Sequence, residues 1–125
     1  MTQQEASDHW RKGARDAIDM AQLGYENGKF ALSLFHCHLA AEKILKAVYI
    51  NERKQDPPPT HHLLSLALQL RHQWSRDEEQ KLIDLTDYAI AARYDDPTWA
   101  ERYATAENTA NWLIFARELV HRLSP

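Results

Sequence analysis

The sequence predicts an all-α fold of five helices, arranged as two long antiparallel helical hairpins plus a short connecting helix. Apolar residues recur at three- and four-residue spacing over long segments, which is typical of amphipathic helices. Residues that end helices and shape turns are scarce, since the 125 residues include 3 glycines and 5 prolines. A chain of this length builds one hydrophobic core, so we expect one domain over residues 1–125.

The first hairpin is predicted from helices over residues 4–27 and 29–53. Thr2 and Glu5 have the spacing of a capping box, and Gly28 supplies the left-handed conformation that ends a helix. The stripe of apolar residues is wider in the second helix than in the first, so we expect the second helix to be the most buried. The inward positions are Trp10, Ala14, Ala17, Ala21 and Tyr25 in the first helix and Phe30, Leu34, Cys37, Ala41, Ile44 and Val48 in the second.

The connecting helix is predicted after a run of prolines at residues 57–59. Each proline pushes the residue before it into extended geometry, so this run cannot be helical. Thr60 is expected to cap a short third helix that ends near Trp74. Ser75 and Glu78 form a further capping box, which predicts the start of the fourth helix.

The second long hairpin is interrupted at the aspartate–proline step of residues 96–97. We expect the fourth helix to end near Arg93, and proline suits the first position of a new helix. Thr98 and Glu101 have the spacing of a capping box. The fifth helix is predicted to continue to about Arg122, with Tyr103, Ala106, Ala110, Leu113, Ala116 and Val120 facing inward.

Composition narrows the range of functions. The formal net charge is −3 and the pI about 6.1, so any contact with nucleic acid must come from a local basic face. Cys37 is the only cysteine, which excludes an intrachain disulfide, and its place on the apolar stripe predicts an inert buried thiol. We see no secretory leader and no apolar run of about 18 residues, so we expect a cytoplasmic protein with no membrane partner.

Three segments resemble the HEPN family, in the same order along the chain. AAEKILKA at residues 40–47 matches the family's A-A-E-K-x-L-K-A hallmark. PPPTHHLLSL at 57–66 resembles its P-x-T-H-x-L connector, and YAIAARYDDP at 88–97 resembles its Y-x-x-x-R-Y-P-D segment. The chain is therefore identified as a member of this family, which implies a HEPN-like bundle that is usually dimeric.

The resemblance also implies a set of activities. Many members are metal-independent endoribonucleases, toxins, or partners of small nucleotidyltransferases. The nuclease members carry an arginine followed, after four to six residues, by a histidine. The guanidinium neutralises charge on phosphoryl oxygens, and the imidazole moves a proton. Arg93 stands at the arginine position, but Thr98, Trp99 and Ala100 stand where the histidine is expected.

The chain therefore departs from the nuclease pattern at its acid–base residue. We expect a dimeric module that binds nucleotide, RNA or a partner protein, with little or no catalysis. The resemblance implies one half of a two-gene, toxin–antitoxin type system with a minimal nucleotidyltransferase. One alternative is an endoribonuclease in which Asp95, Asp96 or Tyr88 replaces the imidazole. Another is a purely structural dimerisation domain. No cofactor or metal motif is present, so neither is expected.

Two candidate sites have open interpretations. Arg93 is either an anion contact or a cation at a helix C-terminus, paired with Asp95 or Asp96. Glu42 and Lys46 are four residues apart on a helix, and they lie either on a solvated face or toward a cleft or partner. The residues expected to contact ligand or partner are Arg93, Tyr94, Lys43, Lys46, Tyr88 and His61.

The remaining histidines and aromatic residues favour structural roles. His36 and His38 are two residues apart and do not share a helix face, so they predict no metal site. The family resemblance implies that His61 acts as a structural hydrogen-bonding residue. The aromatic residues Trp99, Tyr103 and Trp112 either stack on bases or fill a core or dimer seam. The wide apolar stripes predict a homodimer.

Overall fold

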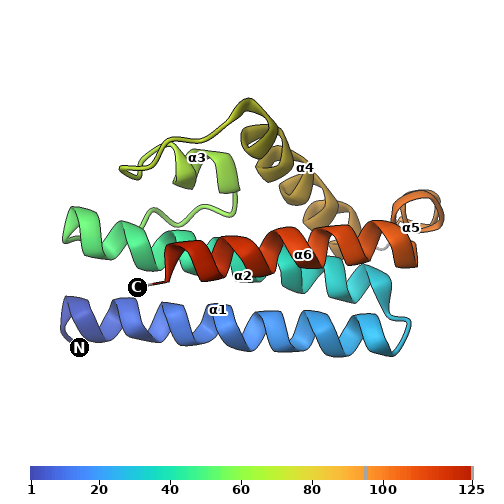
Figure 1. The fold of residues 1–125 in the computed structure, drawn as a ribbon, viewed down its shortest axis with the longest axis horizontal. Helices are drawn as coiled ribbons and strands as arrows, with labels where there is room; N and C mark the ends of the chain where they lie inside the picture. Colours follow the sequence, from blue (N-terminus) through green and yellow to red (C-terminus); the bar gives the residue numbers. More distant parts are fainter. Residues whose placement is uncertain (95, 125) are drawn as a thin grey trace.

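The computed structural model describes residues 1–94 and 96–124, and over these residues it is helical with no β-strand. Figure 1 shows the arrangement of the helices in space. They are α1 (Gln3–Glu26), α2 (Phe30–Arg53), α3 (Leu63–Ala67), α4 (Arg76–Arg93), α5 (Pro97–Tyr103) and α6 (Ala106–Leu123).

Helix α2 is the centre of the bundle. It runs antiparallel to α1, while α6 lies along both and α4 crosses at an angle beside α3 (Figure 1). Helix α2 contacts α1, α3, α4 and α6. It carries 14 buried residues out of 24, which confirms that it is the most buried of the long helices. The largest fully buried apolar side chains are Leu34, Ile44, Leu45, Leu63, Leu66, Leu82 and Leu85.

The turn between α1 and α2 follows the sequence signal. Gly28 has a φ of 70°, a left-handed conformation that costs a residue with a Cβ about 1–2 kcal/mol. Just before the turn, Gly24 lets the two helices approach closely, because a Cβ there would lie 3.4 Å from the backbone nitrogen of Ser33. The Ser33 hydroxyl donates to the Ala21 carbonyl oxygen across the hairpin at 2.7 Å. The predicted first hairpin is confirmed.

The predicted fifth helix is wrong in its continuity, because it is divided into α5 and α6. Ala104 leaves the helical conformation, and Thr105 caps α6 by accepting the N–H of Asn108 at 3.2 Å. The amide of Asn108 also donates to the carbonyl of Tyr103, which closes the break. Ala106, predicted to face inward, is exposed at the start of α6. The described part of the chain therefore has six helices instead of five.

Two predicted caps are also wrong. Asp96, and not Thr98, caps α5, since its carboxylate accepts the N–H groups of Thr98 at 3.0 Å and Trp99 at 3.3 Å. Thr60 does not cap α3, which begins at Leu63 and ends well before Trp74. The capping residue of α4, predicted from its serine–glutamate spacing, is confirmed.

Two general properties of the chain follow from the fold. Cys37 is buried in the core, and burial raises the pKa of its thiol to about 12, which confirms the expected inert cysteine. None of the helices in the described ranges is both long and apolar enough to cross a membrane.

Candidate functional site

A groove of about 630 Å³ lies between α2, α4 and the segment that leads into α3. Apolar side chains make up most of its walls, and histidines, a glutamate and an arginine supply the polar groups. The residues that line it are Phe35, His38, Leu39 and Glu42 of α2, Pro59, Thr60, His61 and His62 of the segment, and Thr86, Ala89, Ile90 and Arg93 of α4.

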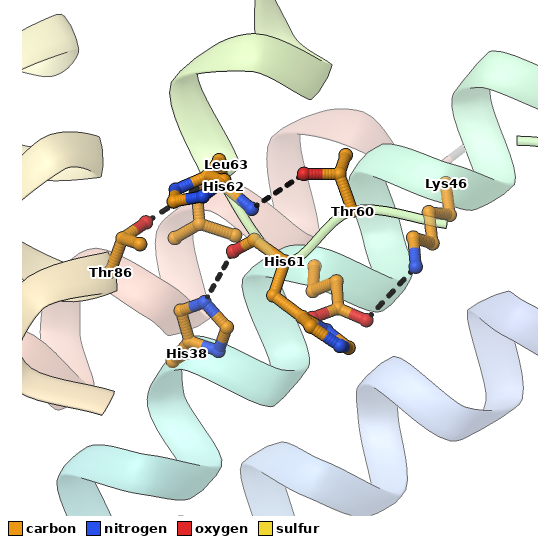
Figure 2. A network of polar contacts seen from close by, with 8 residues as sticks. His38, Lys46, Thr60, His61, His62, Leu63 and Thr86 are labelled. Atoms are coloured by element: carbon orange, nitrogen blue, oxygen red, sulfur yellow. Dashed lines mark hydrogen bonds and ion pairs between the residues drawn. The ribbon is translucent and has the colours of Figure 1, made fainter. Parts of the chain in front are cut away.

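The segment over residues 59–62 forms one wall and is bonded to both neighbouring helices. His38 Nε2 of α2 lies 2.8 Å from the carbonyl oxygen of His61. On the other side, the Thr86 hydroxyl of α4 accepts the N–H of Leu63 at 3.2 Å and donates to the carbonyl of Leu82. Figure 2 shows His38 and Thr86 reaching this segment from two different helices. These bonds hold the non-helical segment of residues 59–62 against α2 and α4.

Glu42 and Lys46 form a buried ion pair beneath the same segment. Their side chains are 6% and 7% exposed, and Lys46 Nζ lies 3.1 Å from Glu42 Oε2. The ammonium of Lys46 also lies 5.4 Å from the centre of the Trp10 ring, within cation–π range. The pair therefore does not lie on a solvated face, and that interpretation is wrong. The alternative, in which the residues face a cleft or partner, holds for Glu42, which lines the groove.

His61 extends from the segment onto this pair. Its Nδ1 lies 2.8 Å from Glu42 Oε1, while its side chain stays 73% exposed. A carboxylate only accepts hydrogen bonds, so Nδ1 carries the proton and Nε2 is the available nitrogen in the neutral ring. His61 thus has the expected structural hydrogen bonds, and it also presents an oriented imidazole at the groove.

His38 has a different electrostatic environment because it is buried. Its Nε2 faces a carbonyl oxygen and must carry a proton to bond there. Desolvation by burial lowers the pKa of His38, although the His61 carbonyl and the Glu42 carboxylate oppose this shift. His38 is therefore a neutral hydrogen-bond donor at neutral pH.

Arg93 is exposed at the C-terminus of α4 and lines the groove. Of its two predicted acidic partners, Asp96 is occupied as the α5 cap, and Asp95 lies outside the described residues. Tyr94 follows directly and is 78% exposed. Arg93 thus lies at the α4 end of the groove, while Tyr94 is not among the lining residues.

Two other predicted contact residues lie apart from the groove lining. The half-buried Tyr88 stands in an aromatic cluster, 5.9 Å, 5.4 Å and 5.3 Å from the ring centres of Trp99, Tyr103 and Trp112. This cluster belongs to the core, and burial raises the pKa of Tyr88. Lys43 lies over Gly13 of α1, where a Cβ would come within 3.0 Å of its Nζ.

The positions at which the family resemblance places a histidine carry no acid–base group. Thr98 is exposed on the first turn of α5, and the ring of Trp99 is buried against Tyr88. Sequence reasoning did not place His38 or Thr86 at the site. No spacing signal could have found them, since each bonds a segment more than 20 residues away.

Comparison with known proteins agrees with this architecture. The sequence model of the HEPN domain matches residues 7–124. The fold is similar to the crystal structure of TT1696 from Thermus thermophilus, with a TM-score of 0.80, 25% sequence identity and coverage of 94% of each chain. No protein with curated annotation matches the sequence.

Lys46→Met is expected to lower the free energy of unfolding by about 3 kcal/mol, because it leaves the Glu42 carboxylate buried without its cation. Chemical denaturation monitored by circular dichroism measures this. The matched control is Lys12→Met, since Lys12 pairs with Asp16 at the same spacing but both side chains are more than half exposed. Equal losses in the two variants would contradict the buried-pair account.

Acidification is expected to destabilise the fold through His38. Its pKa is lowered in the folded state from an ordinary value of 6.5, so below that pH the unfolded chain takes up a proton that the folded chain does not. This contribution is complete above pH 6.5 and is lost as the pH falls. Urea unfolding at about pH 7.5 and about pH 5.5 should show the loss.

His38→Gln should reduce this pH dependence while keeping a donor to the His61 carbonyl. Part of the slope should remain, because burial and Lys43 lower the pKa of His36 in the same direction. An unchanged slope in His38→Gln would show that His38 does not contribute.

Proposed function

The chain belongs to the HEPN family, and from that premise we propose that it is a single-domain, cytoplasmic module whose groove binds the phosphate of a nucleotide or of single-stranded RNA. The observation that carries the proposal is that Arg93 and His61 line one groove with largely apolar walls. The planar guanidinium group of arginine donates hydrogen bonds to phosphate oxygens, and an apolar wall accommodates a base or ribose.

The local charge of the groove supports an anionic ligand. The overall net charge of −3 gives no general attraction to nucleic acid, so binding depends on nearby cations. The negative charge of Glu42 is balanced by Lys46, and Arg93 contributes a guanidinium to the described groove lining. The ring of Phe35 is the aromatic surface for stacking a base.

The predicted contact residues take different parts in this proposal. Arg93 and His61 contact the ligand directly, and Tyr94 extends the contact surface beyond the α4 end. Lys46 acts indirectly by balancing Glu42. Lys43 and Tyr88 are outside the groove lining, so we assign them to a bound partner and to the core respectively.

Arg93→Ala is expected to weaken binding of single-stranded RNA by about tenfold, the effect of losing one charge-assisted hydrogen bond to phosphate. The logarithmic salt dependence should also become shallower by about one. Fluorescence anisotropy with a labelled mixed-sequence oligonucleotide measures both. Arg76→Ala is the matched control, because Arg76 is exposed at the other end of α4. Equal weakening in both variants would place binding outside the groove.

Assembly is the second part of the proposed function. Apolar side chains outside the groove lining remain exposed on α2 and α4, with Leu32 46% and Ile83 39% exposed, and they favour a homodimer. The family membership favours a minimal nucleotidyltransferase as the second partner. The proposed module is one half of a toxin–antitoxin type pair.

We expect sedimentation equilibrium to detect a dimer at micromolar concentration, and Leu32→Glu to shift it toward monomer by placing a charge in the apolar contact. The tagged chain should also recover a nucleotidyltransferase from its native cells. A stable wild-type monomer would contradict the homodimer, and recovery without any nucleotidyltransferase would contradict the two-protein system.

A further inference from the structure

A second groove, of about 670 Å³, lies between α1 and α6 and shares no lining residue with the groove that holds Arg93. We call it the α1–α6 groove. Ile18 of α1 and Val120 of α6 line it as buried residues and form its floor, whereas the charged side chains along its rims are exposed. An apolar floor between charged rims is the form of a surface that binds an amphipathic helix.

The two helices that form the α1–α6 groove run antiparallel along its length (Figure 1). Near one end, Arg11 Nη1 donates to the carbonyl oxygen of Leu123 at 2.9 Å. Near the other end, Arg117 Nη2 donates to Gln22 Oε1 at 2.7 Å. These bonds fix α1 against α6, so the groove is a preformed part of the bundle.

Basic side chains outnumber acidic ones in the described lining of this groove. Lys12, Arg15 and Arg117 carry positive charge, and Asp16 and Asp19 carry negative charge. Lys12 Nζ lies 2.9 Å from Asp16 Oδ2, and this hydrogen bond, together with the charge of Arg15, lowers the pKa of Asp16. Since Lys12 and Asp16 compensate each other, two arginines face the single remaining carboxylate of Asp19, and the rims attract anionic groups.

Exposed apolar side chains extend the groove beyond its charged rims. Leu23 of α1 is 52% exposed and Ile114 of α6 is 53% exposed. Leu23 follows Asp19 by four residues and Ile114 precedes Arg117 by three, so each shares a helix face with a rim residue. Because the helices are antiparallel, both apolar side chains lie at the same end. From Ile114 to Ser124, α6 rises by about 15 Å, or about three turns.

We propose that the α1–α6 groove is a docking site for an acidic amphipathic helix of a partner protein. The apolar side chains of that helix cover the floor of the groove and the exposed Leu23 and Ile114, and its carboxylates pair with Arg15 and Arg117. This inference goes beyond the proposed RNA-binding function and does not depend on it, because no residue lines both grooves.

The lining favours a protein helix over nucleic acid. A phosphate backbone is a continuous row of negative charge, and Asp16 and Asp19 would lie against it. The described residues that line this groove also include no aromatic ring on which a base could stack. A helix presents separate side chains three or four residues apart, so it can place carboxylates against the arginines and neutral or basic groups against the aspartates.

The test uses the purified full chain and three labelled helical peptides of about 14 residues, or about four turns. The first peptide has leucines at three- and four-residue spacing, flanked by glutamates. The second has lysine in place of every glutamate, and the third has the residues of the first in an order that breaks the spacing. Fluorescence anisotropy should show binding of the glutamate peptide that weakens as salt is raised. The other two should bind at least about tenfold more weakly.

Reversal of the rim charges tests the electrostatic part of the inference. Arg15→Glu combined with Arg117→Glu should weaken binding of the glutamate peptide by about tenfold and strengthen binding of the lysine peptide. A damaged fold would not produce that gain. The matched control is Arg76→Glu combined with Arg102→Glu, since both arginines are exposed and lie outside the lining.

Removal of an exposed apolar side chain tests the other part. Ile114→Ser should weaken binding of the glutamate peptide by about fivefold, because the peptide loses an apolar contact at the end of the groove. Leu68→Ser is the control, since Leu68 is 59% exposed and is not part of this lining.

The outcomes distinguish the possible occupants of the groove. The inference is overturned if the glutamate peptide does not bind, if the lysine peptide binds equally well, or if the charge-reversed variant binds as the wild type does. A charge-reversed variant that loses RNA and keeps the peptide would make the groove a nucleic-acid surface. One that sediments as a smaller species than the wild type would make it an interface between copies of the chain. Both results overturn the inference. Failure of the wild type to bind RNA overturns the proposed RNA-binding function alone.

Discussion

The site depends on the attachment of one non-helical segment to the centre of the bundle. Three prolines keep residues 57–59 out of a helix, and the segment up to Leu63 makes only some of its hydrogen bonds within itself. His38 and Glu42 of α2 bond His61, and Thr86 of α4 bonds Leu63. The buried Lys46 balances Glu42 and keeps a carboxylate charged within the fold. Without these contacts the groove would lose the wall that carries its imidazole.

Polar residues that stabilise the fold around α2 are also the residues that shape the groove. More than half of the residues of α2 are buried, and the buried polar residues Ser33, His38, Glu42 and Lys46 are partnered by α1, by the segment or by each other. Arg93 is placed at the groove because α4 ends there, where Asp96 starts α5. Arg93, which the resemblance places at the arginine of the nuclease pattern, thus lines the groove, while the positions expected for a histidine are occupied by a helix start and a buried tryptophan.

Much of the fold is predictable from the sequence, because helical stripes, a left-handed glycine and capping residues are local signals. The break between α5 and α6 was missed because apolar spacing continues across it from Tyr103 to Ala106, although Thr105, three residues before Asn108, is a local capping residue. The site was predictable only in part. Glu42–Lys46 and Lys12–Asp16 share the same spacing, yet the first pair is buried and the second exposed. Burial of a charge pair depends on what packs over it, which periodicity does not show.

The central claim is that Glu42 fixes His61 with Nε2 available to a ligand in the groove. Nitrogen-15 NMR of the histidine side chains tests this directly, because the two tautomers have distinct nitrogen shifts and couplings. The account predicts that neutral His61 carries its proton on Nδ1, and that added single-stranded RNA shifts its Nε2 resonance together with the Arg93 side-chain signal. A proton on Nε2, or shifts confined to residues outside the groove, would contradict the account.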